Sequence, residues 1–336
     1  MRLLTTTAIL GLLAAKAVAA PPQIVTDIPV TGSLVQQVMG ELGEVRVLIG
    51  DGADPHHFQM RPSDAAALQS AELLVWIGPE MTPWLERAAD NLGNGSSLSL
   101  LAVPGTHLRK FGAEGDDHAE HAHGDHEHVN DHAHGDHGHD NEHEHEHEHH
   151  EEHDHEHGHS HDGTDPHAWL DPHNAQVWLT VIAEELAALD PANAEAYAAN
   201  AEASVKQIEA LEAQINAQLE PVKDRPFAVF HDAYGYFTAH FGLLPGIAVS
   251  LGDASAPSAA RLSEVSTQIA DSGAECAFPE YGHKQSLIQN AIEGSDARIG
   301  DELDPAGRGV EAGPDLYADV LKNMGDVLAE CLSGEG

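Results

Sequence analysis

Short apolar runs alternate with helical segments along the chain from position 23 onward. The apolar runs have the length of buried strands, and in the first part of the chain they cover residues 24–30, 45–49, 73–77 and 97–101. Residues 32–39 and 63–70 between them are predicted to be helical, the second with a Pro-Ser-Asp start signal. Strands that alternate with helices predict a parallel sheet with helices on its faces.

The same alternation returns in the last third of the chain. The candidate strands there are residues 227–231, 247–250, 276–279 and 298–300. The candidate helices are residues 258–271, 284–294 and 315–332. No internal sequence repeat is evident, and the chain is long enough for two domains. We therefore predict an α/β protein of two lobes, each with a mostly parallel sheet flanked by helices.

One long helix is predicted to join the two lobes. Residues 190–220 are rich in strong helix formers, with Leu, Ile and Val recurring at three and four residues, and Pro221 follows them. Such a helix would exceed roughly 40 Å and could pass along both lobes. We predict an N-terminal lobe over 20–189, this rigid connector, and a C-terminal lobe over 221–336.

A histidine-rich insertion interrupts the N-terminal lobe at residues 114–163. It repeats His with Asp or Glu and has almost no apolar residues, so it should be disordered without metal. Its imidazoles can bind zinc, copper or nickel. They are His118, His121, His123, His126, His128, His132, His134, His137, His139, His143, His145, His147, His149, His150, His153, His155, His157, His159 and His161.

The first residues have the pattern of a cleavable secretory signal. Arg2 precedes a short apolar stretch, and Ala17-Val18-Ala19 offers small residues for cleavage, so residues 1–19 are predicted to be removed. No later stretch approaches the roughly 18 consecutive apolar residues of a membrane helix. We expect the mature protein to be periplasmic, without insertion into the membrane.

The chain is strongly acidic, with a formal net charge of −41. The insertion holds 18 of the 56 acidic residues, so the rest of the chain is acidic in its own right. Such a balance argues against nucleic-acid binding. It favours the attraction of cations, although excess acid also keeps an exported protein soluble.

The chain has two cysteines, Cys276 and Cys331. An even, minimal number in an exported protein favours one disulfide. Closing a loop of that length would stabilise the fold by on the order of 4 kcal/mol in the chain-entropy model. A two-thiolate metal site is the weaker alternative, since thiols tend to oxidise in that compartment.

Three histidines outside the insertion stand where an ordered element begins or ends. His56 follows an apolar strand, His167 precedes a helix, and His231 ends the strand at 227–231. Ligands of open α/β sheets bind beyond the carboxyl ends of the strands. Three convergent histidines with one further ligand would make a tetrahedral zinc site. The alternative for each is a hydrogen-bonded, half-buried histidine. The other histidines have weaker contexts and are His57, His107, His173, His240 and His283.

Four segments of the chain, together spread over nearly all of it, closely resemble one family. They are GADPHHFQMRPSDAAALQSAELLVWIGPEM (52–81), DPHAWLDPHNA (165–175), FAVFHDAYGYF (227–237) and ELDPAGRG (302–309). The family is that of the zinc-uptake substrate-binding proteins of bacterial ABC transporters, the ZnuA family within the metal-binding receptor cluster. Its members share an acidic, His-rich insertion between the first two segments.

The resemblance implies a zinc site made by His56, His167 and His231. The fourth ligand varies among relatives, and a glutamate before the first histidine is ruled out here by Pro55. Asp304 is then the remaining protein candidate, with water as the alternative. Related manganese receptors have a carboxylate in place of His231, so the three-histidine set favours zinc.

The resemblance also implies a function for the whole chain. It would be a periplasmic receptor that captures Zn(II) as transported ligand between its lobes and delivers it to a membrane permease with a cytoplasmic ATPase. It would not be an enzyme, and we expect a monomer. The family's disulfide in the second lobe matches Cys276 and Cys331, and its rigid connector matches the long helix. We expect the histidine run to capture metal and pass it inward, the alternative being a buffer or sensor.

Three other functions are less consistent with the sequence. A metallohydrolase would need a general base, for which Glu280 or Asp232 are nominal candidates, but no HExxH arrangement occurs. A metal-storage or chaperone protein would need only the histidine run and would leave the two lobes unexplained. A receptor for another divalent metal such as Mn(II) is the third alternative.

Overall fold

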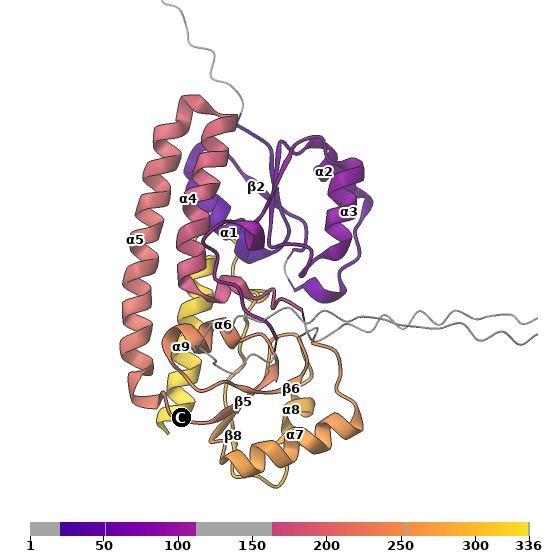
Figure 1. Ribbon diagram of the computed structural model, residues 1–336, viewed down its shortest axis with the longest axis vertical. Helices are drawn as coiled ribbons and strands as arrows, with labels where there is room; N and C mark the ends of the chain where they lie inside the picture. Colours follow the sequence, from indigo (N-terminus) through magenta and orange to yellow (C-terminus); the bar gives the residue numbers. More distant parts are fainter. Residues whose placement is uncertain (1–20, 51, 112–162, 253, 335–336) are drawn as a thin grey trace, which may run out of the picture.

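The computed structural model describes residues 21–50, 52–111, 163–252 and 254–334. Within these ranges the chain forms two α/β lobes, one above the other in Figure 1. The predicted signal segment and the histidine run of 118–161 lie outside the described residues. No helix of the described part is long and apolar enough to cross a membrane.

The upper lobe contains a four-stranded sheet in the order β2-β1-β3-β4, with every neighbouring pair parallel. Its strands are β1 (Ile24–Thr26), β2 (Val45–Val47), β3 (Leu73–Trp76) and β4 (Ser96–Ser99). Its helices are α1 (Pro29–Met39), α2 (Pro62–Ser70) and α3 (Pro83–Leu92). β3 is buried along its whole length, as expected for a strand covered on both faces.

The lower lobe repeats this topology with the order β6-β5-β7-β8, again all parallel. Its strands are β5 (Phe227–His231), β6 (Ile247–Ser250), β7 (Cys276–Phe278) and β8 (Arg298–Ile299). Its helices are α6 (Gly235–Phe241), α7 (Ala259–Ser272), α8 (Gln285–Ala291) and α9 (Leu316–Ser333). The predicted fold class of two parallel-sheet lobes is therefore confirmed.

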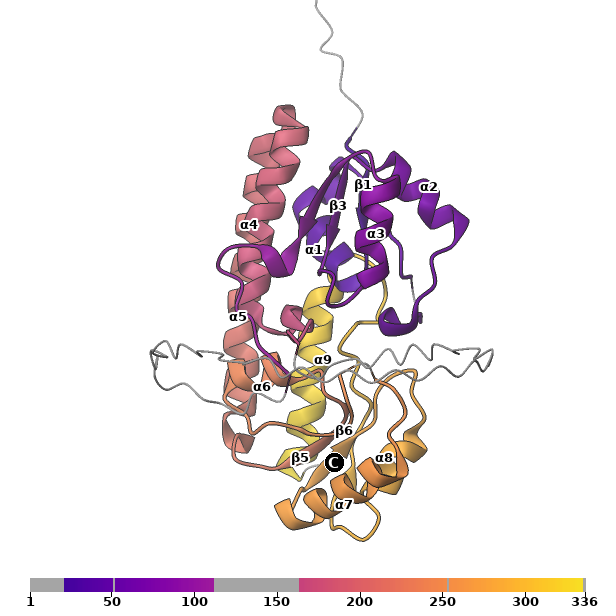
Figure 2. The ribbon, with the colours of Figure 1, turned by 45° about the vertical axis from the view of Figure 1, so that its right-hand side comes forward.

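A pair of long helices runs beside the two lobes. α4 (Pro172–Leu189) and α5 (Ala194–Leu219) pack against each other, and α5 reaches from the upper lobe to the lower one in Figure 1. Short 3₁₀ turns at Pro191–Asn193 and Glu220–Val222 flank α5. α9 begins beside α1, where the Tyr317 N–H donates to the Ser33 hydroxyl at 3.1 Å, and it contacts α5 as it runs down into the lower lobe in Figure 2. The two lobes are thus joined by two helices as well as by loops.

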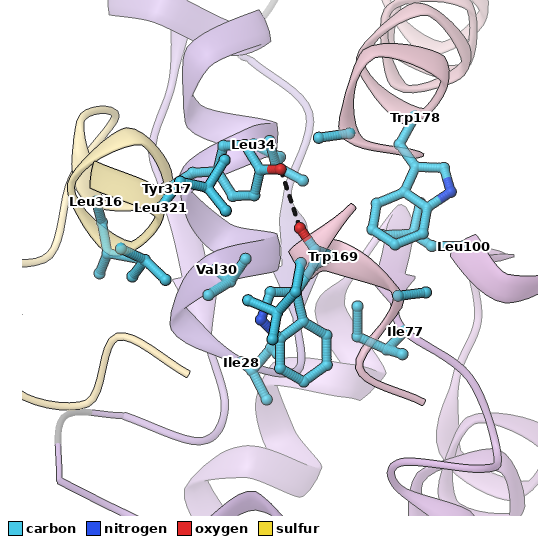
Figure 3. Packing of buried hydrophobic residues seen from close by; sticks show 14 of the residues in the cluster. Ile28, Val30, Leu34, Ile77, Leu100, Trp169, Trp178, Leu316, Tyr317 and Leu321 are labelled. Carbon is cyan, nitrogen blue, oxygen red and sulfur yellow. Dashed lines mark hydrogen bonds between the residues drawn. The ribbon is translucent and has the colours of Figure 1, made fainter. Parts of the chain in front are cut away.

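The apolar core is continuous across the junction of the lobes. Trp169 and Tyr317 are fully buried there, and the Tyr317 hydroxyl donates a hydrogen bond of 2.9 Å to the Trp169 carbonyl (Figure 3). The Trp169 indole donates in turn to the carbonyl of Pro305, at 2.7 Å. Because buried polar groups are costly when unpaired, these bonds fix the segments that carry them. In the lower lobe a disulfide joins Cys276 of β7 to Cys331 of α9, as predicted.

A polar bridge also ties the lower lobe to the helix pair. His240 of α6 places Nδ1 2.8 Å from the Asp171 carboxylate at the start of α4 and Nε2 3.0 Å from the Glu212 carboxylate of α5. Burial lowers the pKa of His240, but the hydrogen bonds and charges of the two carboxylates outweigh it, so the pKa is raised. Burial raises the pKa of Asp171, yet hydrogen bonds from His240 and His107 leave it lowered overall. His107 also stacks on His173, with the two rings 4.0 Å apart.

We expect this bridge to stabilise the fold in a limited pH range. Because the pKa of His240 is raised in the folded state, His240 contributes to the free energy of unfolding. This contribution is complete below the ordinary histidine pKa of 6.5 and is lost as pH rises through the folded-state pKa. The lowered pKa of Asp171 gives a second contribution to stability. It is present above the ordinary aspartate pKa of 3.8 and is lost as pH falls through the folded-state pKa. His240→Ala should therefore lower the free energy of unfolding by about 1–3 kcal/mol at about pH 5.5 and by clearly less at about pH 9. Urea titrations measure both, and exposed His57→Ala is the control. An equal loss at the two pH values would contradict the bridge.

Candidate metal centre

His56 reaches the junction of the lobes from a short turn of the upper lobe. The turn, Pro55–His57, is a 3₁₀ helix whose preceding residue, Asp54, accepts a hydrogen bond from the His56 backbone N–H at 3.0 Å. Pro55 occupies the first position of the turn, where its missing N–H has no cost. The local sequence Asp-Pro-His thus fixes the backbone that presents the His56 ring.

His167 and His231 come from different elements and share one feature. His167 directly precedes the 3₁₀ turn Ala168–Leu170, and its Nδ1 lies 2.7 Å from the Asp165 carboxylate. His231 is the last residue of β5, and its Nδ1 lies 2.5 Å from the Glu280 carboxylate. Each carboxylate accepts the Nδ1 proton of its histidine, so that the opposite nitrogen, Nε2, is left to act as a ligand.

The three imidazoles converge on one point. One possible ligand atom from each of His56, His167 and His231 lies within 4.8 Å of the other two. The three ring centroids are 5.2 to 5.9 Å apart, and the Nε2 atoms of His167 and His231 face each other at 3.3 Å. His167 and His231 are buried and His56 is half-buried. Among the described residues this is the single group of three or more His, Cys, Asp or Glu side chains with such spacing.

The surroundings keep two of the three rings neutral. Burial, together with the neighbouring imidazoles, lowers the pKa of His56 and of His167 well below 6.5. Burial acts in the same direction on His231, but the Glu280 carboxylate outweighs it and raises the pKa. Burial raises the pKa of Asp165 to about 7. Since a histidine must be neutral to bind a metal, His56 and His167 are ready to act as ligands at neutral pH.

The remaining candidates lie outside this group. Asp304 is half-buried, and its two carboxylate oxygens accept the backbone N–H groups of Arg308 and Gly309 at 2.9 and 2.7 Å. It is not among the side chains that converge with the three histidines. Of the other histidines, His283 places its Nε2 3.7 Å from the Glu280 carboxylate, and its ring lies 4.4 Å from that of Phe230.

The sequence did not predict the role of two residues that shape the centre, and it named Glu280 only as a nominal general base of an alternative enzyme. Asp165 and Glu280 orient His167 and His231, and Tyr234 adds a hydrogen bond of 2.9 Å to the Glu280 carboxylate. Asp165 lies two residues before its histidine in Asp-Pro-His, as Asp54 does before His56, which was a usable signal. Glu280 follows β7, the neighbour of β5, so its side chain belongs to the same edge of the sheet as His231.

Comparisons with known proteins place the chain in a family. The sequence profile described as zinc-uptake complex component A, periplasmic (ZnuA), matches residues 24–331. The chain belongs to the ZnuA family. A high-affinity zinc uptake system protein ZnuA of Paracoccus denitrificans is 55% identical over 98% of this chain and 97% of that protein. One of Brucella suis is 37% identical over 92% of this chain and 91% of that protein.

Solved structures support the fold of this ZnuA-family chain. A periplasmic metal-binding protein from Candidatus Liberibacter asiaticus superposes with a TM-score of 0.69 at 18% identity, covering 92% of this chain and 98% of that one. The laminin-binding protein Lbp of Streptococcus pyogenes gives a TM-score of 0.68 at 21% identity, covering 94% of this chain and 100% of that one. At these identities the likeness concerns the arrangement of lobes and helices.

Proposed function

We propose that this chain is a periplasmic receptor that binds Zn(II) between its lobes and delivers it to an ABC-type permease with a cytoplasmic ATPase. The observation that carries the proposal is the convergence of His56, His167 and His231 from both lobes, with Asp165 and Glu280 orienting two of the rings. The names of the Paracoccus and Brucella relatives, which are zinc uptake proteins, support zinc as the cargo.

The donor set fits zinc chemically. Zinc binds imidazole nitrogen in tetrahedral sites, and carboxylate partners on the far ring nitrogen raise the basicity of the ligating one. Water is our proposed fourth ligand, since no fourth described side chain converges with the three. Harder, oxygen-rich sites suit manganese better than a three-histidine set does.

The proposal also assigns a part of the structure to each range of the chain. We assign residues 20–189 to the N-terminal lobe, 190–220 to the connector and 221–336 to the C-terminal lobe, with 1–19 as the export signal. Both lobes supply ligands, so bound zinc would join them at their junction. The helices α5 and α9 connect the same two lobes along their side. A permease that separates the ligand-bearing segments would then release the ion.

Zinc uptake in cells tests this function. We expect the chain, together with the permease and ATPase of its own source organism, to restore zinc accumulation and growth in zinc-starved bacteria that lack a zinc receptor. A variant with His56, His167 and His231 all changed to alanine should not restore either, because it has lost the site. A variant with His57 and His173 changed to alanine is the matched control. Equal uptake by the triple variant would contradict the proposal.

A further inference from the structure

The segment after β8 forms a tight turn whose shape depends on Asp304. The Asp304 carboxylate accepts the N–H groups of Arg308 and Gly309, and its backbone carbonyl accepts that of Gly307 at 3.3 Å. Gly307 has φ +67°, a left-handed conformation that favours glycine. Both carboxylate oxygens of Asp304 are therefore already used to close the turn at 304–309.

This turn touches the segments that carry all three histidines. The Pro305 carbonyl accepts the indole N–H of Trp169, two residues beyond His167. The residue before the turn, Leu303, pairs with the segment of Glu280, whose carboxylate orients His231. Arg308 at the other end of the turn contacts the loop that leads to His56. The turn is thus the common neighbour of three chain segments that are far apart in the sequence.

Arg308 makes one of the contacts between the lobes. Its guanidinium donates to the carbonyl of Gly52 at 3.1 Å and to the carbonyl of Tyr281 at 3.3 Å, and its backbone carbonyl accepts the Gly52 N–H at 3.2 Å. Gly282 leaves room for the guanidinium, because a Cβ there would lie 2.7 Å from Nη2. The planar fork of arginine suits this double contact in a way that the point charge of lysine does not.

His56 has the greatest need of such a contact. His167 and His231 are each oriented by a buried carboxylate at 2.7 and 2.5 Å, whereas the His56 ring has no hydrogen-bond partner among the described residues. Its position depends on its backbone, which Asp54 fixes locally and Arg308 anchors to the other lobe. A ligand whose segment can swing away leaves the metal held by two histidines.

We propose that Asp304 and Arg308 are positioning residues that hold the His56 segment against the other two ligands and so set the rate of zinc release. In this role Asp304 acts through the turn and does not bind the metal, which differs from its role as a candidate ligand in the sequence. The proposal rests on the function proposed above. It adds that the turn at 304–309 holds the His56 segment in place and so slows the release of zinc.

Release kinetics and a spectroscopic probe test the positioning role of Asp304 and Arg308 in the full mature chain. Zinc release is followed after mixing with excess chelator, and the ligand set is read from the visible spectrum of bound Co(II). We expect Arg308→Ala to release zinc about 10–100-fold faster, as expected for the loss of a contact outside the ligand set, and Arg308→Lys to be intermediate. Asp304→Asn should also release faster. The Co(II) spectrum should match the parent in all three, which also shows that the site has formed.

Two controls separate the possible failures. Arg225→Ala removes an exposed arginine of the same lobe, paired with Glu275 at 2.6 Å, and should leave release unchanged. The triple alanine variant of the three histidines gives the signal of the histidine run alone. If that variant keeps the slowly released ion, the proposed zinc site is wrong. If the triple variant loses the ion but Arg308→Ala releases zinc at the parent rate, the zinc site stands and the proposed positioning role of the turn is wrong. An altered Co(II) spectrum in Asp304→Asn would instead show that Asp304 is a ligand.

Discussion

Changing His56, His167 and His231 together to alanine is expected to abolish the tightest zinc site of the protein. Each imidazole supplies one nitrogen, and carboxylates at 2.7 and 2.5 Å fix the orientation of two of the rings. We expect the affinity of the strongest remaining site to be lower by roughly three orders of magnitude or more. Calorimetric titration of the mature chain with zinc measures this as the disappearance of the first, tight phase.

A matched variant keeps the histidine count equal. Changing His57, His107 and His173 to alanine also removes three imidazoles, but none of them belongs to the converging group. That variant should retain the tight phase, and the weaker binding by the remaining histidines should be similar in both. A tight phase that survives in the first variant, or disappears in both, would contradict the assignment.

Hydrophobic periodicity was sufficient to predict the fold class, because buried parallel strands and flanking helices leave strong patterns. It was insufficient to reveal that both sheets have the same strand order. Apolar runs record that a strand is buried but not which strand lies beside it, and the residues of the two lobes differ at corresponding places. The repeat is therefore a property of topology that this sequence alone does not display.

The prediction from sequence was wrong at one element boundary, between β1 and α1, and it missed two helices, α3 and α6. The apolar run at 24–30 was predicted as one strand, but β1 ends at Thr26 and α1 begins at Pro29, whose fixed φ suits the first turn of a helix. α6 was not predicted, since its Gly235–Phe241 sequence is rich in aromatic residues of modest helix propensity. Burial of three aromatic residues of α6 outweighs that propensity. α3 was missed although Thr82-Pro83 is a usable start signal.

The candidate site was predicted more completely than its supports. The histidines were identified because each stands at the end of an ordered element, and that position is visible in the sequence. The contacts of Asp304 are not visible, because they depend on a turn with a left-handed glycine and on a carboxylate that serves two N–H groups. A motif match marks Asp304 as important without distinguishing a ligand from a residue that positions the ligands.

Trp169→Ala is expected to damage both the fold and the zinc site. The indole is fully buried among apolar side chains (Figure 3). It lies 5.2 Å from the His167 ring and donates a hydrogen bond to the Pro305 carbonyl of the turn. Removing it should lower the free energy of unfolding by about 3–5 kcal/mol, the usual cost of emptying a buried tryptophan site. Zinc affinity should fall by about tenfold or more, because His167 loses its packing and the turn loses an anchor.

Trp178→Ala separates these two effects. Trp178 is also fully buried, and its indole donates to the Thr106 hydroxyl at 2.9 Å. Among the described residues it is not one of the aromatic rings that contact His167, whereas Trp169 is. The loss of Trp178 should destabilise the fold by a similar amount, about 3–5 kcal/mol, without changing zinc affinity. Chemical unfolding and zinc competition on the two variants give both quantities. If the two variants lose equal stability and equal affinity, zinc binding depends on the general stability of the fold. If Trp169→Ala alone loses affinity, the tryptophan acts on the centre through His167 and the turn at 304–309.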